Sequence, residues 1–279
     1  MFLLKQILPA VIMAMVVAAG ICSLGLYVGR DRARKALAPV AIGIAYLSGH
    51  LFVAGWATFP PSDTTNWLPY FALAVGVLGA LCELFPTKAW IRVIVLVAVS
   101  TGALRLLLKP RFQYGWSVSQ GWVWILSLAG AILLLALILD ALVRLPVMAI
   151  ELPAWLAIIA GGTFAALMLS GSMLLGQLAA LLGAAVFGTL VFVARKVALG
   201  RGVAPVFALL LGVLLTSGYF FAELPLASAI LLACAPGFAL LPIGTPGKML
   251  AFGIRSALVS LPVLVAIGLA FRSSPPLDY

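Results

Sequence analysis

The side chains that could do chemistry in this sequence are few, and the first of them is its single histidine. His50 lies in the stretch YLSGHLFVAGW, among apolar and small residues. A neutral imidazole carries one N–H donor and one acceptor nitrogen, and it titrates near neutral pH where water or an acidic partner reaches it. Two interpretations of His50 stay open: a residue that packs between helices through one hydrogen bond, or a group that contacts a solute or couples its movement to a proton.

Two short segments with a glycine at their centre are the other candidates for a solute site. One is AVSTGALR, residues 98–105, and the other is ACAPGFAL, residues 233–240. Proline removes a backbone donor and interrupts a helix, which frees backbone groups that can line a cavity. We expect a break at corresponding depth in both segments. The predicted solute or proton site therefore comprises His50, Ser100, Thr101, Gly102, Pro236 and Gly237.

No metal or cofactor pattern accompanies these residues. Cys22, Cys82 and Cys234 lie singly in apolar segments, without the paired spacing of a zinc or haem-attachment motif. The single histidine cannot complete a metal site with a second one. We expect no metal, no cofactor and no catalytic residue.

The acidic residues at helix ends have a structural and a catalytic interpretation. Asp140 and Arg144 are four residues apart, which favours an ion pair within one helix. Glu83 precedes FPTK, which favours a boundary ion pair with Lys88 or Arg92. Glu83 and Asp140 are also the candidate carboxylates of an intramembrane lipid-processing enzyme, the least favoured of three functions.

Composition decides the class of protein. Of the 279 residues, 65% are hydrophobic and 9% are charged, whereas a soluble domain carries about 25% charged residues. The apolar excess must face lipid, where helices and closed barrels are the structures that satisfy the backbone. The apolar segments are long and lack the alternation of barrel strands. The sequence predicts an all-α, polytopic integral membrane helix bundle whose first partner is the lipid bilayer.

About 20 apolar residues cross a bilayer, and charged or proline-rich segments divide the chain into ten such spans. We place a hairpin near Gly176 and Gln177, because the uncharged stretch 154–194 is too long for one crossing. The predicted spans are 7–28, 37–57, 68–85, 91–108, 122–143, 154–175, 178–194, 205–222, 226–242 and 250–271.

Basic residues indicate which loops face the cytoplasm. Five of the 17 Lys and Arg belong to one side, and twelve fall in the alternate connections. Both termini should therefore lie outside the cytoplasm, with the protein in the plasma or inner membrane. The net charge of +10 does not indicate nucleic-acid binding, because no water-facing domain gathers these residues. The twelve are Arg30, Arg32, Arg34, Lys35, Lys88, Arg92, Arg144, Arg195, Lys196, Arg201, Lys248 and Arg255.

The chain forms a single transmembrane domain, residues 1–279, that divides into halves 1–145 and 146–279 of five spans each. An odd number of spans gives two halves opposite orientations, the arrangement of many secondary carriers. We expect a non-enzymatic carrier of a small or lipid-like solute. The alternative is a structural or assembly subunit of a larger membrane complex or a homo-oligomer, favoured by short loops and small-residue helix contacts.

The charge asymmetry generates a topology test. Reporters fused or labels attached at Arg32 and Arg201 should report the cytoplasm, whereas Ser62 and Ser273 should report the outside. An external signal at Arg201 would mean that 154–194 does not form a hairpin, which would contradict the ten-span topology.

Overall fold

The structure is a computed structural model that describes residues 2–56, 59, 61, 63, 65–85, 88–145, 148–195, 197–242 and 247–273. Within these ranges the regular elements are all helices. They are α1 (Phe2–Gly25), α2 (Asp31–Ala54), η1 (Thr65–Trp67), α3 (Leu68–Leu84), α4 (Ala89–Leu107), α5 (Lys109–Tyr114), α6 (Val118–Arg144), α7 (Glu151–Leu169), α8 (Met173–Gly188), α9 (Leu190–Ala194), α10 (Val203–Phe221), α11 (Leu226–Cys234), η2 (Ala235–Leu240) and α12 (Lys248–Ser273).

The helices confirm the predicted all-α membrane bundle. Nine helical segments of the described chain are long and apolar enough to cross a bilayer. The shorter apolar segment Leu226–Leu240 occupies the place of the ninth predicted span. Because each predicted span corresponds to one helical segment, the protein is a multi-pass membrane protein whose lipid-facing surface is apolar.

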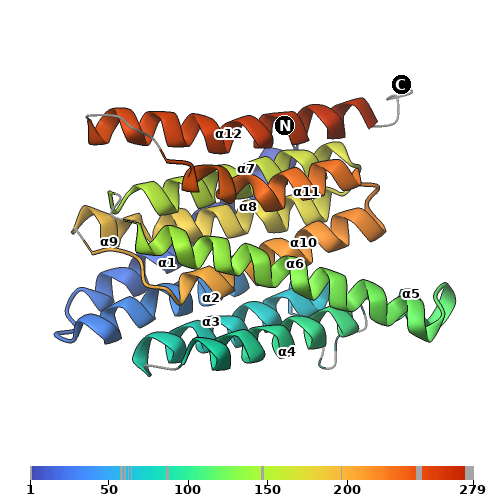
Figure 1. Cartoon of the computed structure of the whole chain (residues 1–279), viewed down its shortest axis with the longest axis horizontal. Coiled ribbons are helices and arrows are strands. Elements are labelled where there is room, and N and C mark those ends of the chain that lie inside the picture. Colours follow the sequence, from blue (N-terminus) through green and yellow to red (C-terminus); the bar gives the residue numbers. More distant parts are fainter. Residues whose placement is uncertain are drawn as a thin grey trace.

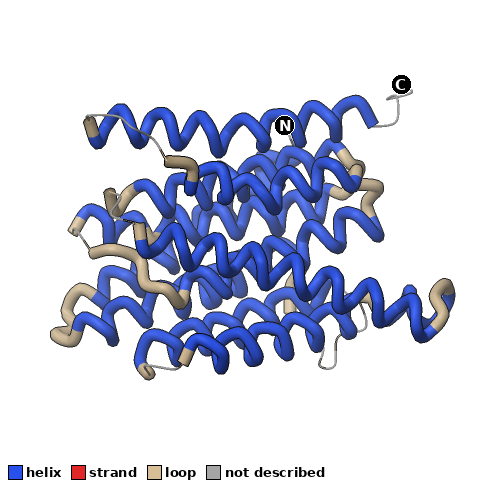
Figure 2. Tube along the Cα trace, viewed as in Figure 1, coloured by secondary structure: helices blue, strands red, loops and turns tan. Residues whose placement is uncertain are grey.

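The helices run roughly parallel to one long axis, so their connections gather at two ends (Figures 1 and 2). The C-terminal ends of α1, α3, α6, α9 and η2 point to the left in Figure 1, and those of α2, α7 and α10 point to the right, where α5 also lies. The described residues among the twelve basic residues of the predicted cytoplasmic side lie in the connections or helix turns at the left end, and we call this end the basic end. Lys196 lies outside the described residues.

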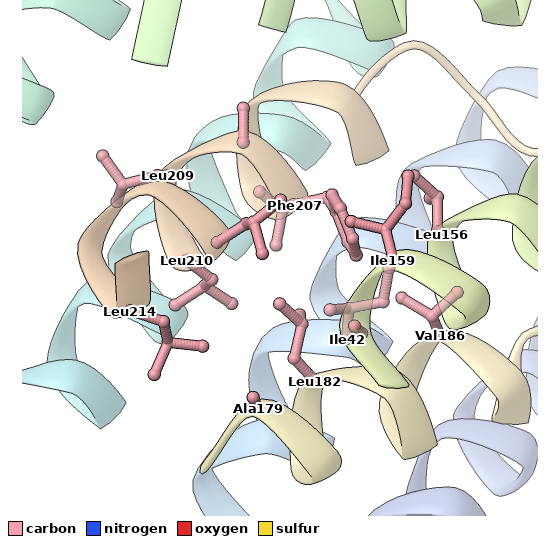
Figure 3. Packing of buried hydrophobic residues seen from close by; sticks show 14 of the residues in the cluster. Ile42, Leu156, Ile159, Ala179, Leu182, Val186, Phe207, Leu209, Leu210 and Leu214 are labelled. Carbon is pink, nitrogen blue, oxygen red and sulfur yellow. The ribbon is translucent and has the colours of Figure 1, made fainter. Parts of the chain in front are cut away.

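The core of the bundle forms around α10. Of the spanning helices α10 is the most buried, and it packs against α3, α6 and α8. Phe207, Leu210 and Leu214 of α10 point toward side chains of α7 and α8, among them Ile159 and Leu182 (Figure 3). Because α10 carries no charged side chain, no face of it needs to reach water or a headgroup.

The hairpin in the long uncharged stretch is confirmed, but our placement of its turn was wrong. The chain turns at Ser170–Ser172, and Gly171 adopts a φ of +84°, which a residue with a Cβ rarely adopts. The Ser172 hydroxyl accepts a hydrogen bond from Leu175 N at 3.4 Å and begins α8. Gly176 and Gln177, where we placed the turn, are buried within α8.

The predicted helix break at Pro236 is confirmed, whereas the predicted helix break at Gly102 is wrong. The α-helical segment α11 ends at Cys234, and the chain continues through the 3₁₀ turn η2, which contains Pro236 and Gly237. In contrast, α4 is continuous from Ala89 to Leu107 and passes through Gly102. Gly102 retains its backbone donor, unlike a proline, so a glycine in the middle of an apolar helix did not interrupt it. The corresponding breaks we expected in the two halves are therefore not a pair.

Glycines permit the closest helix crossings. A Cβ on Gly43 of α2 would lie 2.6 Å from the backbone carbonyl oxygen of Ala72 in α3, and Gly76 lies on the facing side of the same crossing. A backbone atom cannot move aside as a side chain can. In contrast, a Cβ on Gly161 of α7 would meet no atom within 4 Å.

We expect Gly43→Ala to lower the free energy of unfolding by about 1–3 kcal/mol, because the added methyl forces α2 and α3 apart. The control Gly161→Ala should be neutral or stabilising by up to about 1 kcal/mol, because alanine favours a helix. Thermal unfolding of the purified protein measures both. Equal stability of the two variants would contradict the close crossing.

Candidate functional site

His50 lies in a small cavity and is not joined there by the other predicted site residues. Its side chain is 1% exposed, and neither ring nitrogen has a hydrogen-bond partner within the described chain. The cavity measures about 30 Å³, about enough for one water molecule, and lies between α2 and α3 beside Trp56 and Tyr70. A role of His50 in proton coupling or solute contact stays a prediction.

The remaining predicted site residues lie on two other elements, α4 and η2. Ser100 of α4 is fully buried, and its hydroxyl has no partner among the described residues. Gly102 faces open space on the same helix. Pro236 is buried in η2, which packs against α6 and α12, and a Cβ on Gly237 would lie 3.9 Å from Ile138 of α6. Of the six predicted residues, His50 alone lines the cavity between α2 and α3, and a solute site shared by all six stays a prediction.

A larger cavity, which we call the charged cavity, lies between α3, α4, α6 and α10 and measures about 130 Å³. Apolar side chains form its walls, among them Val75, Leu96, Val99 and Leu133. Toward the basic end the lining changes from apolar to charged, and we call this charged part of the lining the mouth. The charged lining residues are Arg92, Asp140, Arg144 and Arg201.

Asp140 organises this mouth. Its carboxylate accepts two hydrogen bonds from Arg201, from Nε at 2.6 Å and from Nη2 at 2.7 Å. It also forms the ion pair with Arg144 that the i,i+4 spacing predicted. Arginine is charged at every physiological pH, and the hydrogen bond to Asp140 raises the pKa of the Arg201 guanidinium further. Asp140 therefore joins the end of α6 to the loop before α10.

Glu83 fixes the same loop from the other side. Its carboxylate Oε1 accepts a hydrogen bond from Gly202 N at 2.6 Å, one residue after Arg201. The backbone of Gly202 approaches that of Gly79 so closely that a Cβ on Gly202 would lie 2.2 Å from the Gly79 carbonyl oxygen. The hydrogen bond from Gly202 to Glu83 holds the loop against α3, and Arg201 in this loop lines the charged cavity.

A second cavity, which we call the apolar cavity, lies between α6, α10 and α11 and measures about 120 Å³. Its lining runs from Trp124 and Tyr219, near the end opposite to the basic end, to Gly212 in the middle of α10. No charged side chain occurs among its described lining residues. The Thr216 hydroxyl, which lines it, donates to the Gly212 carbonyl oxygen at 2.7 Å and so offers little polarity to a ligand.

Helix α6 separates the two cavities. Leu133, Ala136 and Asp140 face the charged cavity, whereas Leu128 and Leu135 face the apolar cavity. Residues two apart on a helix point about 200° away from each other, so the two sets occupy opposite sides of α6.

At the middle of the helix, a Cβ on Gly212 would lie 2.4 Å from Ile132 Cγ1, which shows that α6 and α10 are in close contact between the cavities.

Arg201 is the site residue that the sequence did not reveal. Arg201 lies 61 positions from Asp140, and nothing in the local spacing connects the two. The spacing of Asp140 and Arg144 did predict one of the two ion pairs of Asp140. The loop that contains Arg201 was recognised as basic, but its contact with Asp140 was not predicted. The signal that could have found it is the unusual combination GRG, residues 200–202, before a charge-free helix.

Comparisons with known proteins leave the geometry as the sole guide to function. No family model matches the chain, and no curated protein or solved structure is significantly similar to it.

We expect Asp140→Asn to lower the free energy of unfolding by roughly 1.5–3 kcal/mol, because two guanidinium groups lose a charged hydrogen-bond acceptor at a partly buried position. The matched control is Asp31→Asn, which removes an exposed carboxylate from its i,i+4 pair with Lys35 (2.9 Å) and should cost about 0.5 kcal/mol or less. Chemical or thermal unfolding measures both. A loss at Asp140 no larger than that at Asp31 would contradict the organising role of Asp140.

Proposed function

We propose that the protein is a non-enzymatic carrier of a lipid-like amphiphilic solute, with its basic end toward the cytoplasm. The observation that supports this function best is the pair of cavities on opposite sides of α6, one toward each end of the bundle. A carrier needs a site that opens to one side of the membrane at a time. Two partly open cavities that are separated by one helix provide the parts of such a site.

The chemistry of the linings suggests the kind of solute. The charged cavity combines a guanidinium-rich mouth with apolar walls, and the apolar cavity continues the apolar surface toward the other end. A small hydrophilic solute would find few polar partners in the apolar cavity, whose lining is apolar apart from Trp124, Thr216 and Tyr219. An amphiphile matches both cavities, because its headgroup has charged partners and its chain has apolar ones.

The movement that we propose is a shift of α6 against α10. The contact of Ile132 with Gly212 is made of apolar atoms and a glycine, so its loss breaks no hydrogen bond between the two helices. At the basic end, Asp140 and Arg201 hold α6 and α10 together. We propose that α6 pivots near this ion pair, which would narrow one cavity while the other opens.

The alternative function, a structural subunit of a larger complex, would not need either cavity. It predicts a second chain that copurifies at fixed stoichiometry and no transport by the protein in isolation. The carrier predicts transport by the protein in vesicles that contain no other protein.

The expected result is that the protein, reconstituted in liposomes, moves fluorescent phospholipids between leaflets, as measured by quenching of the outer leaflet. Ala136→Phe should fill the charged cavity and Ala229→Phe the apolar cavity, and each should slow transport at least about tenfold, because a bulky side chain in a close-packed site obstructs it. The control is Ala98→Phe on the exposed surface of α4, which should transport as the unaltered protein does.

Transport at the unaltered rate by both cavity-filling variants would contradict the carrier proposal at these cavities. Folding of each variant is checked by its elution as a single species and its unfolding temperature. A loss of transport in Ala229→Phe with a normal unfolding temperature is the most specific result, since that residue is distant from the ion-pair cluster.

A further inference from the structure

The mouth of the charged cavity carries an excess of positive charge. Three arginines line it, whereas Asp140 is the single carboxylate among the described lining residues. A second carboxylate, that of Glu83, interacts electrostatically with Arg201. Its hydrogen bond, however, is to the backbone N–H of Gly202. With both carboxylates counted, these five side chains have a net charge of +1.

The contacts within the mouth show which ligand chemistry it suits. Arg201 holds Asp140 with two parallel N–H···O bonds, the geometry with which arginine also binds phosphate oxygens. Arg144 shares the same carboxylate, yet its side chain is 60% exposed. An exposed guanidinium can reorient toward a second oxyanion with little loss of hydration, so Arg144 can bind one without Arg201 leaving Asp140.

The third arginine of the mouth, Arg92, lies on α4. Its Nη2 donates to the Cys82 carbonyl oxygen at 3.1 Å, which holds the guanidinium on the α3 side of the cavity. Arg92 and Arg144 therefore approach the same opening from α4 and α6. Two guanidiniums on different helices can contact one phosphate from two sides, which gives it more charge-assisted hydrogen bonds than a single surface arginine does.

The walls behind the mouth exclude a purely ionic ligand. Val99 and Leu133 extend the lining about two turns of helix away from the arginines, into the apolar part of the bundle. A cavity of about 130 Å³ is close in size to the 150 Å³ apolar cavities that admit benzene. It can hold the first carbons of a chain, and the remainder of a lipid would extend into the bilayer.

We propose that the charged cavity is a binding site for a bilayer phospholipid with an anionic headgroup, whose phosphate lies between Arg92 and Arg144 and whose first chain carbons lie along Leu96 and Leu133. A zwitterionic headgroup suits the site less, because its cation would meet a mouth that is already positive. This inference names the solute of the proposed carrier and rests on that function for its role as cargo, but binding itself does not require transport.

The test measures binding to the full-length protein in detergent. The unfolding temperature is followed as dioleoylphosphatidylglycerol, dioleoylphosphatidylcholine or inorganic phosphate is added, since a ligand of the folded state raises this temperature more the more tightly it binds. We expect phosphatidylglycerol to bind at least about tenfold more tightly than phosphatidylcholine, and inorganic phosphate to have no effect at the same concentration.

Variants then locate the site. Arg92→Gln and Arg144→Gln should each weaken phosphatidylglycerol binding about tenfold, as expected for loss of a charge-assisted hydrogen bond. Arg144→Lys should weaken it less, because it retains the charge and loses the fork. The matched control is Arg32→Gln, which removes one exposed charge at the same end of the bundle, outside the cavity, and should change affinity less than twofold. Ala136→Phe should abolish binding without changing any charge.

Three results would overturn the inference. Equal binding of both phospholipids would show that the arginines do not select the headgroup. An equal loss in Arg32→Gln would show that the lipid responds to the general charge of the basic end. Stabilisation by inorganic phosphate alone would show a site for a free anion. Selective binding by a protein that transports no phospholipid would retain this inference and refute the carrier, so the two proposals fail independently.

Discussion

The position of α10 at the centre of the bundle is the constraint on which the rest of the structure depends. An apolar helix that is buried on every side gains its stability from packing, since lipid offers the helices no hydrophobic driving force to associate. Its neighbours must therefore approach closely, and Gly79, Gly202 and Gly212 are where they do so. Phe207, Leu210 and Leu214 of α10 are fully buried toward α7 and α8 (Figure 3), whereas both larger cavities lie between α10 and other helices, namely α3, α4, α6 and α11.

The basic end fixes α10 by polar contacts that the middle of the bundle lacks. Gly202 N donates to Glu83, and Arg201 donates to Asp140, so the first residues before α10 are tied to both α3 and α6. Removing one partner of such a cluster leaves charged groups partly buried and unpaired, which costs more free energy than the pair contributes. The same cluster forms the mouth of the charged cavity. Structural and proposed binding roles therefore fall on the same side chains.

The helical membrane fold could be predicted from the sequence, whereas the charged cavity could not. Long apolar segments and interrupting charges determine helix number and approximate bounds, because the bilayer imposes both the length and the hydrogen bonding of each span. Pro236 was a reliable signal, since proline removes a donor whatever its surroundings, whereas Gly102 stays helical because glycine removes nothing. The mouth of the charged cavity could not be predicted in full, because Arg201 reaches Asp140 through the packing of α10 on α6. His50 is the single histidine of the chain, but the sequence does not show which helices surround it.

Cysteine accessibility tests most directly whether α6 separates two cavities that open alternately. In protein whose Cys22, Cys82 and Cys234 are replaced, Leu137→Cys reports the charged cavity and Leu128→Cys the apolar cavity. A membrane-impermeant thiol reagent is applied from each side of oriented vesicles, with and without phosphatidylglycerol as the added lipid. Alternating opening predicts that the added lipid changes the two labelling rates in opposite directions. Rates that do not respond to the lipid, or that rise together as in an open channel, would contradict the account.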